Sequence, residues 1–199
     1  MSYETTPTTY DSHEDWLVVS KISTNDVLFL KKMVDALIDK FNIESCTHNK
    51  STTGEGARQY DLFNYMNDSC FGLPLVDKVR AELQNVLERE NRGNKDVHLL
   101  SAWTVFGYEN SFHSIHKHNQ KVYYNHIATV IYLDVPDVVD KNRSGAFYAV
   151  LQDYKKENYT FVHRPVVGNM LTFPIWICHG SEPQTCGLRQ TLNLDFEIK

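Results

Sequence analysis

The chain has 199 residues, of which 42% are hydrophobic and 23% charged, and its formal net charge is −5. This length suits one domain that needs no disulfide staples. The mild negative charge argues against a large nucleic-acid footprint, which requires clustered Lys and Arg. No apolar run approaches the roughly 20 residues of a membrane-spanning helix.

The N-terminus and the cysteines indicate a cellular location. Residues 1–14 are polar and contain no Lys or Arg, so they lack the charged start and apolar centre of a signal peptide. The four cysteines form no C-x-x-C pair and are expected to be free thiols in a reducing compartment. We therefore predict a polar tail over 1–14, one domain over 15–199 and a cytoplasmic protein.

The first part of the domain is predicted to be mainly helical. Residues 16–22 read as a short strand, and 23–26 (STND) supply residue types that cap helix N-termini. Apolar residues then recur at spacings of three and four, which indicates an amphipathic helix. These residues are Val27, Leu30, Val34, Leu37, Ile38 and Phe41.

A second helix is expected after a polar, glycine-containing loop at 46–59. Pro74 suits the first turn of that helix. One face of the helix is apolar, with Val76, Val79, Leu83, Val86 and Leu87. The predicted helical layer therefore spans about 24–92.

Beyond this layer the sequence changes to short β-rich runs separated by turns. The seven runs cover 97–108, 111–118, 126–135, 145–151, 159–164, 169–174 and 188–198. Short strands at roughly even spacing favour a sandwich or barrel. We predict an α+β, mainly β fold in which two helices cover one face of an antiparallel β-sandwich.

Three histidines fall within positions 113–118. If this segment is a strand, His116 and His118 share one face and His113 points away. Two imidazoles on one face can bind one metal ion, but such a pair is also typical of a solvated or hydrogen-bonded site. The candidate third ligand is His179, which follows an apolar strand some sixty residues downstream. The other histidines, His13, His48, His98, His126 and His163, are expected at the surface or in polar networks.

The last predicted strand carries a second candidate site. Arg189, Thr191 and Asn193 share one face of this strand, opposite a mostly apolar face. The planar guanidinium of Arg189 can bind a carboxylate through two parallel contacts. The alternative is an exposed polar face on an edge strand.

Together these residues resemble the iron(II)- and 2-oxoglutarate-dependent oxygenases. That family has an H-x-D/E motif, a distant His and, about ten residues later, R-x-S or R-x-T. The corresponding segments here are HKH at 116–118, CHG at 178–180 and RQT at 189–191. Residues 168–180 also resemble the family's G-(x)n-F-P-x-W-x-x-H segment. The resemblance covers the chain from about Trp16 onward. Within that family, the sequence is similar to small oxygenases of bacterial and phage genomes.

The resemblance implies a fold, a reaction and residue roles. The fold is a double-stranded β-helix, or jelly roll, over about 97–198. The reaction hydroxylates a C–H bond, consumes O2 and releases succinate and CO2. His116 and His179 would bind Fe(II). Arg189 would bind the distal carboxylate of 2-oxoglutarate, with Thr191 and Tyr132 as hydrogen-bonding helpers.

One position departs from the family pattern, because His118 replaces the usual carboxylate ligand. His118 is the favoured third ligand. A carboxylate from elsewhere, such as Asp134 or Glu109, or a site with only two His ligands are the alternatives. Three neutral ligands also make zinc a stronger competitor for the site.

Two other functions remain open at this point. A cupin-type enzyme would bind a metal ion with three His and would not use 2-oxoglutarate. A non-catalytic jelly-roll module would bind neither a metal ion nor 2-oxoglutarate.

The substrate is expected to be a small molecule or a peptide, with a prolyl peptide as the first expectation. The loops at 46–59 and 119–125 are expected to border the cavity mouth, where Tyr123 and Tyr124 could stack on a substrate. A homodimer is a further possibility.

Overall fold

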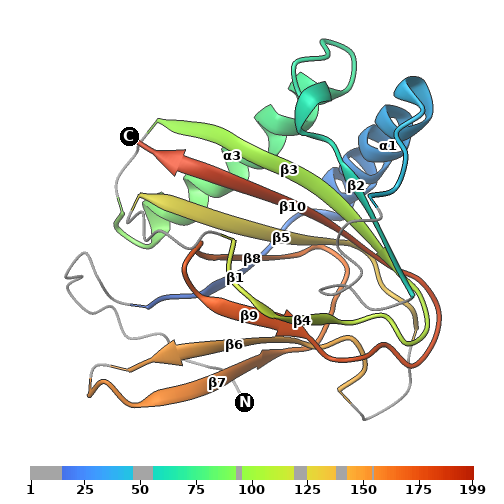
Figure 1. The fold of residues 1–199 in the computed structure, drawn as a ribbon. Coiled ribbons are helices and arrows are strands. Elements are labelled where there is room, and N and C mark those ends of the chain that lie inside the picture. Colours follow the sequence, from blue (N-terminus) through green and yellow to red (C-terminus); the bar gives the residue numbers. More distant parts are fainter. Residues whose placement is uncertain (1–14, 47–55, 93–95, 119–124, 138–142, 154) are drawn as a thin grey trace.

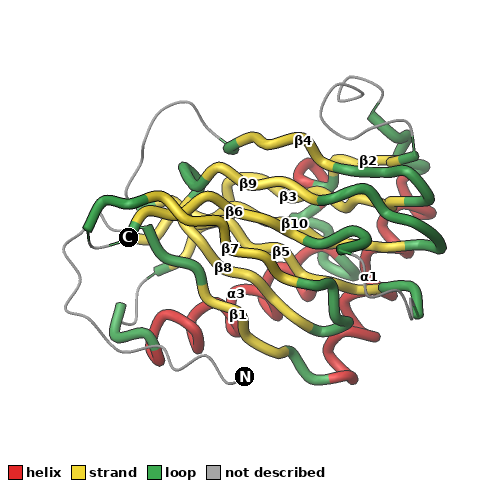
Figure 2. The backbone as a smooth tube through the Cα atoms, turned by 90° about the horizontal axis from the view of Figure 1, so that it is seen from below, coloured by secondary structure: helices red, strands yellow, loops and turns green. Residues whose placement is uncertain are grey.

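The computed structural model describes residues 15–46, 56–92, 96–118, 125–137, 143–153 and 155–199. Two antiparallel sheets pack face to face, and two helices cover the outer face of the larger sheet (Figure 1). The view from below shows both helices on the same side of that sheet (Figure 2). The predicted sandwich with a helical layer is therefore confirmed.

The larger sheet has six strands in the order β1-β8-β5-β10-β3-β2. Their bounds are β1 Val18–Lys21, β2 Ala57–Asp61, β3 Val97–Gly107, β5 His126–Asp134, β8 Asn169–Pro174 and β10 Arg189–Ile198. The smaller sheet has the order β4-β9-β6-β7. Its bounds are β4 His113–His116, β6 Phe147–Gln152, β7 Asn158–His163 and β9 Cys178–Ser181.

The two helices follow their sequence signals. Helix α1 spans Thr24–Phe41, and the Ser23 hydroxyl accepts a hydrogen bond from the Asp26 backbone N–H at 3.2 Å. Helix α3 spans Gly72–Arg89, with the proline of its sequence in the first turn as predicted. A short 3-10 helix, Phe63–Tyr65, precedes α3.

Two apolar cores hold these layers together. The first lies between the helices and the larger sheet and includes Leu192, Leu194 and Phe196 of β10. The second lies between the two sheets and includes Phe147 and Phe173.

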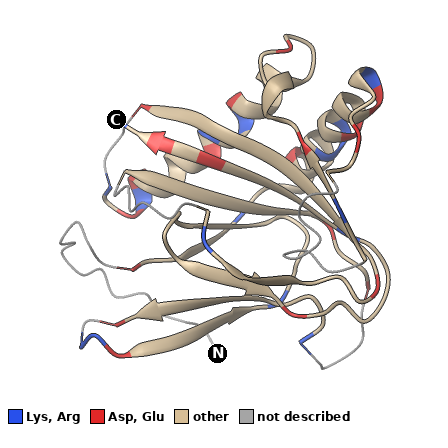
Figure 3. Cartoon of the chain, viewed as in Figure 1, with Lys and Arg blue, Asp and Glu red and all other residues tan. Residues whose placement is uncertain are grey.

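Charged residues lie mostly on helices and turns, although the C-terminal part of β10 carries acidic residues (Figure 3). One face of β10 therefore packs in the apolar core under the helices, and its other face carries polar and acidic side chains.

The sequence reading missed two strands. The end of the predicted 46–59 loop forms β2, because pairing with β3 orders a polar segment (ARQYD) that lacks apolar alternation. The second, β9 (CHGS), has only four residues and also lacks that pattern. His13, His48, Tyr123 and Tyr124 lie outside the described residues.

Two further predictions concern the whole chain. All four cysteines are free, and three of them are exposed. Among the described residues, neither helix is both long and apolar enough to cross a membrane.

Candidate metal and anion site between the sheets

The smaller sheet brings two of the candidate histidines together. His116 of β4 pairs with His179 of β9, and His113 pairs with Ser181. Between these pairs, two residues of β4 lie opposite one residue of β9, which is a β-bulge with one extra residue. The bulge changes the side-chain alternation, so His113 also lines the cavity. The prediction that His113 points away was wrong for this reason.

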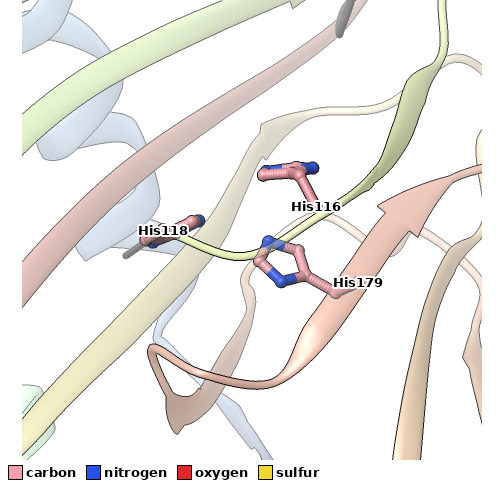
Figure 4. A group of neighbouring side chains, drawn as sticks. All are labelled: His116, His118 and His179. Carbon is pink, nitrogen blue, oxygen red and sulfur yellow. The ribbon is translucent and has the colours of Figure 1, made fainter. Parts of the chain in front are cut away.

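The three predicted ligands form one cluster. His116, His118 and His179 can each offer one nitrogen, and these atoms lie within 4.8 Å of one another. Figure 4 shows the three rings around a common space, with His118 on the segment just beyond β4. The ring centroid of His179 lies 4.5 Å from that of His116 and 4.8 Å from that of His118.

The hydrogen bonds of the rings determine which nitrogen is available. Nδ1 of His116 contacts the Ser114 carbonyl oxygen at 2.7 Å, and Nδ1 of His179 contacts the Ile177 carbonyl oxygen at 2.9 Å. A carbonyl oxygen only accepts, so both Nδ1 atoms carry hydrogen and both Nε2 atoms keep a lone pair. This tautomer is the one that a metal ion requires.

His118 differs from the other two because its partner is a carboxylate. Its Nδ1 lies 2.7 Å from Oδ1 of Asp195 on β10. The contact again leaves Nε2 directed to the cluster. Three imidazole nitrogens in this arrangement suit Fe(II) or Zn(II).

Burial favours the neutral form of two of the predicted ligands. It lowers the pKa of His179 well below the ordinary value and lowers the pKa of His116 as well. The pKa of the neighbouring His113 falls to about 3, mainly through burial and secondarily through the nearby charge of protonated His116. Neutral imidazoles can bind a metal ion without first losing a proton.

The predicted alternative carboxylate ligands lie elsewhere. Asp134 forms an ion pair with Lys31 of α1, and Glu109 is exposed. The cluster found among the described residues contains no carboxylate.

Arg189 lies at the other end of the same cavity. It is 5% exposed, and it donates to the Gly145 carbonyl oxygen at 2.5 Å and to the Ser181 hydroxyl at 3.2 Å. A Cβ atom at Gly145 would lie 2.7 Å from the guanidinium, so the close approach requires glycine. Among the described residues, no carboxylate forms an ion pair with Arg189.

Neutral hydrogen-bonding groups surround this cation. Tyr132 of β5 is paired with Thr191 of β10 in the larger sheet, and both line the cavity with Arg189. Burial raises the pKa of Tyr132 to about 12, so the phenol keeps its proton at neutral pH. The Thr191 hydroxyl accepts from Asn193 at 3.2 Å. The predicted polar face of β10 thus faces the cavity.

Two cavities meet at the histidine cluster. The narrower one reaches Arg189, Tyr132 and Thr191. The larger one has a volume of about 420 Å³. It is lined by Gln59, Ser101, Trp103, His113, His116, Lys117, His118 and Asp195. His113, His116 and His118 line both cavities, whereas His179 lines only the narrower of the two.

Sequence reasoning missed Asp195 and Trp103. Asp195 shares the strand parity of Arg189, Thr191 and Asn193, and this signal was available in the sequence. The Trp103 ring lies edge-on to His118, with 5.1 Å between centroids. No periodicity distinguishes Trp103 from an ordinary core residue.

Comparison with known proteins relates this fold to a group of solved structures. A scan against protein-family models gives no match, and a search of curated sequences gives none either. A prolyl-4-hydroxylase from Pseudomonas putida is similar at a TM-score of 0.63 and 13% identity, with 92% of each chain covered.

Two further structures show the same fold. An oxidoreductase of the 2OG-Fe(II) oxygenase family from Burkholderia pseudomallei has a TM-score of 0.65 and 9% identity, covering 91% of this chain and 84% of that one. A prolyl hydroxylase from Trichoplax adhaerens, in complex with a hypoxia inducible factor peptide fragment, has a TM-score of 0.64 and 12% identity. It covers 91% of this chain and 83% of that one. The predicted jelly-roll fold is confirmed.

Proposed function

We propose that this protein is an Fe(II)- and 2-oxoglutarate-dependent dioxygenase that hydroxylates a C–H bond. His116, His118 and His179 would bind iron, and Arg189 would bind the co-substrate with help from Thr191 and Tyr132. One O2 and one 2-oxoglutarate would be consumed for each hydroxyl group formed, with release of succinate and CO2. The fold shared with 2OG-Fe(II) oxygenases supports this reaction class.

The observation that carries the proposal is the buried guanidinium of Arg189. A buried cation without a counter-ion is unfavourable, because burial removes its hydration. Its two described partners are a carbonyl and a hydroxyl, and neither carries a charge. A carboxylate ligand would supply the missing negative charge through two parallel contacts. The cavity between Arg189 and the histidine cluster suits an anion that reaches from one to the other.

2-Oxoglutarate has the chemistry for both ends of this cavity. One carboxylate would lie against Arg189, where the Tyr132 phenol can donate a further hydrogen bond. The keto-acid end would lie near the histidine cluster. Iron bound there would supply the O2 activation and C–H oxidation that no side chain performs. The protein would orient the co-substrate and keep water away through the apolar walls formed by Val130 and Phe147.

The larger cavity is the proposed substrate side. Its volume of about 420 Å³ is within the range of small-ligand pockets. Its lining includes Gln59, Lys117 and Trp103, which offer hydrogen bonds, a positive charge and an aromatic surface. A peptide containing proline is the first substrate to test, because two of the similar structures are prolyl hydroxylases.

The proposal is tested by incubating the iron-loaded protein aerobically with isotopically labelled 2-oxoglutarate and proline-containing peptides. Mass spectrometry should detect labelled succinate and a peptide heavier by one oxygen atom. Both products should require Fe(II) and O2, and His179→Ala should abolish them. Unchanged peptide and 2-oxoglutarate in the wild-type reaction would count against this reaction and substrate together.

A second candidate function is favoured by the three-His set itself. A cupin-type metalloenzyme with three His ligands would bind the metal but would not need 2-oxoglutarate. In that enzyme Arg189 would bind a different anion, namely the substrate. A protein that binds Fe(II) and ignores 2-oxoglutarate would support this function over the first.

A further inference from the structure

Asp195 is buried beside the histidine cluster without a cationic side chain. It is 8% exposed, and its Oδ1 lies 2.7 Å from Nδ1 of His118. Its Oδ2 accepts a hydrogen bond from the Ser101 hydroxyl at 2.8 Å. Among the described residues, no Lys or Arg forms an ion pair with it. The carboxylate is therefore fixed at both oxygens and directed at one histidine.

This contact distinguishes His118 from the other two histidines. His116 and His179 contact neutral backbone carbonyls through Nδ1, whereas His118 contacts a negative charge. His118 is also the residue that stands where related oxygenases have a carboxylate ligand. The position without the expected charge is thus the only one of the three with a carboxylate directly behind it.

We infer that Asp195 is a positioning residue that supplies, through His118, the negative charge that the three-His ligand set lacks. The inference rests on the proposed metal site and extends it. Nδ1–H of His118 donates a hydrogen bond to the Asp195 carboxylate, which makes Nε2 a stronger electron donor to a bound cation. Three histidines and Asp195 together carry the same charge as two histidines and a carboxylate ligand.

The strand β10 places Asp195 for this role. Arg189, Thr191, Asn193 and Asp195 alternate along one face of the strand, so co-substrate groups and the carboxylate share one rigid element. Asp195 pairs with Ser101 of β3 in the sheet register, and the same Ser101 fixes its second oxygen. The charge is therefore held by the larger sheet, whereas His118 comes from the segment after β4.

The test is the affinity for Fe(II), measured anaerobically by competition with a chelating dye. Asp195→Asn keeps the shape and the acceptor oxygen and removes only the charge. It should weaken Fe(II) binding by about 10- to 100-fold, as expected for loss of a partner behind a ligating histidine. The matched control is Glu197→Gln, which also removes one charge from β10. The Glu197 carboxylate contacts Asn125 and no histidine of the cluster. The effect of Glu197→Gln should stay below about fivefold, as for a partly exposed charge.

The outcomes separate this inference from the proposed function. If the wild type binds no Fe(II), both fail. If the wild type binds Fe(II) and Asp195→Asn binds equally well, only the role of Asp195 is overturned. Complete loss of Fe(II) binding, equal to that in His179→Ala, would indicate that Asp195 is a direct ligand. This result would also overturn the inference that Asp195 acts through His118.

A measurement on the wild type covers the case in which Asp195→Asn does not fold. In the zinc-loaded protein, NMR of the ring N–H groups should place the Nδ1 hydrogen of His118 farther downfield than those of His116 and His179. The reason is that only its acceptor is a carboxylate, and charge-assisted hydrogen bonds are shorter and stronger. Equal chemical shifts for all three hydrogens would overturn the inference.

Discussion

The two faces of β10 meet very different surroundings. On the helix side, Leu192 and Leu194 are fully buried in the apolar core. On the other side, Arg189 and Asp195 are almost as buried, yet they lie in a polar cavity between the sheets. The same strand therefore supports stability on one face and binding on the other.

The difference shows how the fold can contain an unfavourable site. Burial of apolar side chains stabilises the first region, whereas burial of a cation and a carboxylate costs free energy in the second. The helix-covered core must offset that cost. Substitutions on the two faces should consequently affect different measurements: stability on one side, ligand binding on the other.

The largest effect is expected on the cavity side, for His179→Ala. This change should weaken Fe(II) binding by at least about 100-fold, because loss of a ligand exceeds loss of a partner behind it. Metal analysis after anaerobic loading measures the effect, with His98→Ala, an exposed histidine of β3, as the control. Normal iron occupancy in His179→Ala would exclude His179 as a ligand.

The next largest effect is expected in the helix-covered core. Leu194→Ala should lower the free energy of unfolding by about 2–5 kcal/mol, because it removes a fully buried side chain and leaves a cavity. Urea denaturation measures the loss. The fraction that stays folded should bind Fe(II) with wild-type affinity. A loss of only about 0.5 kcal/mol, typical of a surface position, would contradict this account of the core.

Arg189→Met should produce the opposite pattern. Affinity for 2-oxoglutarate should fall at least about tenfold, since a hydrogen bond to a charged group is worth about 1.5–3 kcal/mol. The free energy of unfolding should stay unchanged or rise, because an unpaired buried cation is replaced by an apolar chain. Calorimetric titration and urea denaturation test the two parts. Unchanged 2-oxoglutarate affinity would remove Arg189 from the site.

The effect that is smallest near neutral pH is a pH dependence of stability in the metal-free protein. The pKa of His113 is about 3 in the folded protein, against 6.5 as its ordinary value. Below pH 6.5 the unfolded chain therefore binds a proton that the folded protein does not. The contribution of His113 to the free energy of unfolding is fully present above pH 6.5. It decreases as the pH falls toward 3, by up to about 1.4 kcal/mol per pH unit.

Replacing His113 tests the pH dependence. In His113→Gln, the fall in the free energy of unfolding between pH 6.5 and 4 should be shallower than in the wild type. Urea denaturation at several pH values measures both slopes. Identical slopes would show that His113 does not contribute.

The sequence predicts much of the architecture because its signals are local. The helical stripe around Leu30 and the alternation of β10 each follow from a periodic pattern, and both elements are present as predicted. The three-His cluster could also be anticipated, from spacing and from resemblance to a family. These features depend on residues close together in the sequence or on an ordered motif.

The remaining features depend on contacts that no local pattern encodes. The bulge in β4 turns His113 into the cavity, and the extra residue is visible only when β4 is paired with β9. The contact of Asp195 with His118 joins residues 77 positions apart. The strand parity of Asp195, which the sequence prediction left out, agrees with its observed face, but only the packing of the two sheets identifies His118 as its partner.

The central claim is that Arg189 and the histidine cluster bind one 2-oxoglutarate between them. Anaerobic titration of the Fe(II)-loaded protein with 2-oxoglutarate, followed by visible absorbance, tests it most directly. A weak charge-transfer band should appear in the wild type and saturate, and Arg189→Met should need at least about tenfold more 2-oxoglutarate. If Fe(II) binds and no band appears at any 2-oxoglutarate concentration, the claim is contradicted and the cupin-type function takes its place.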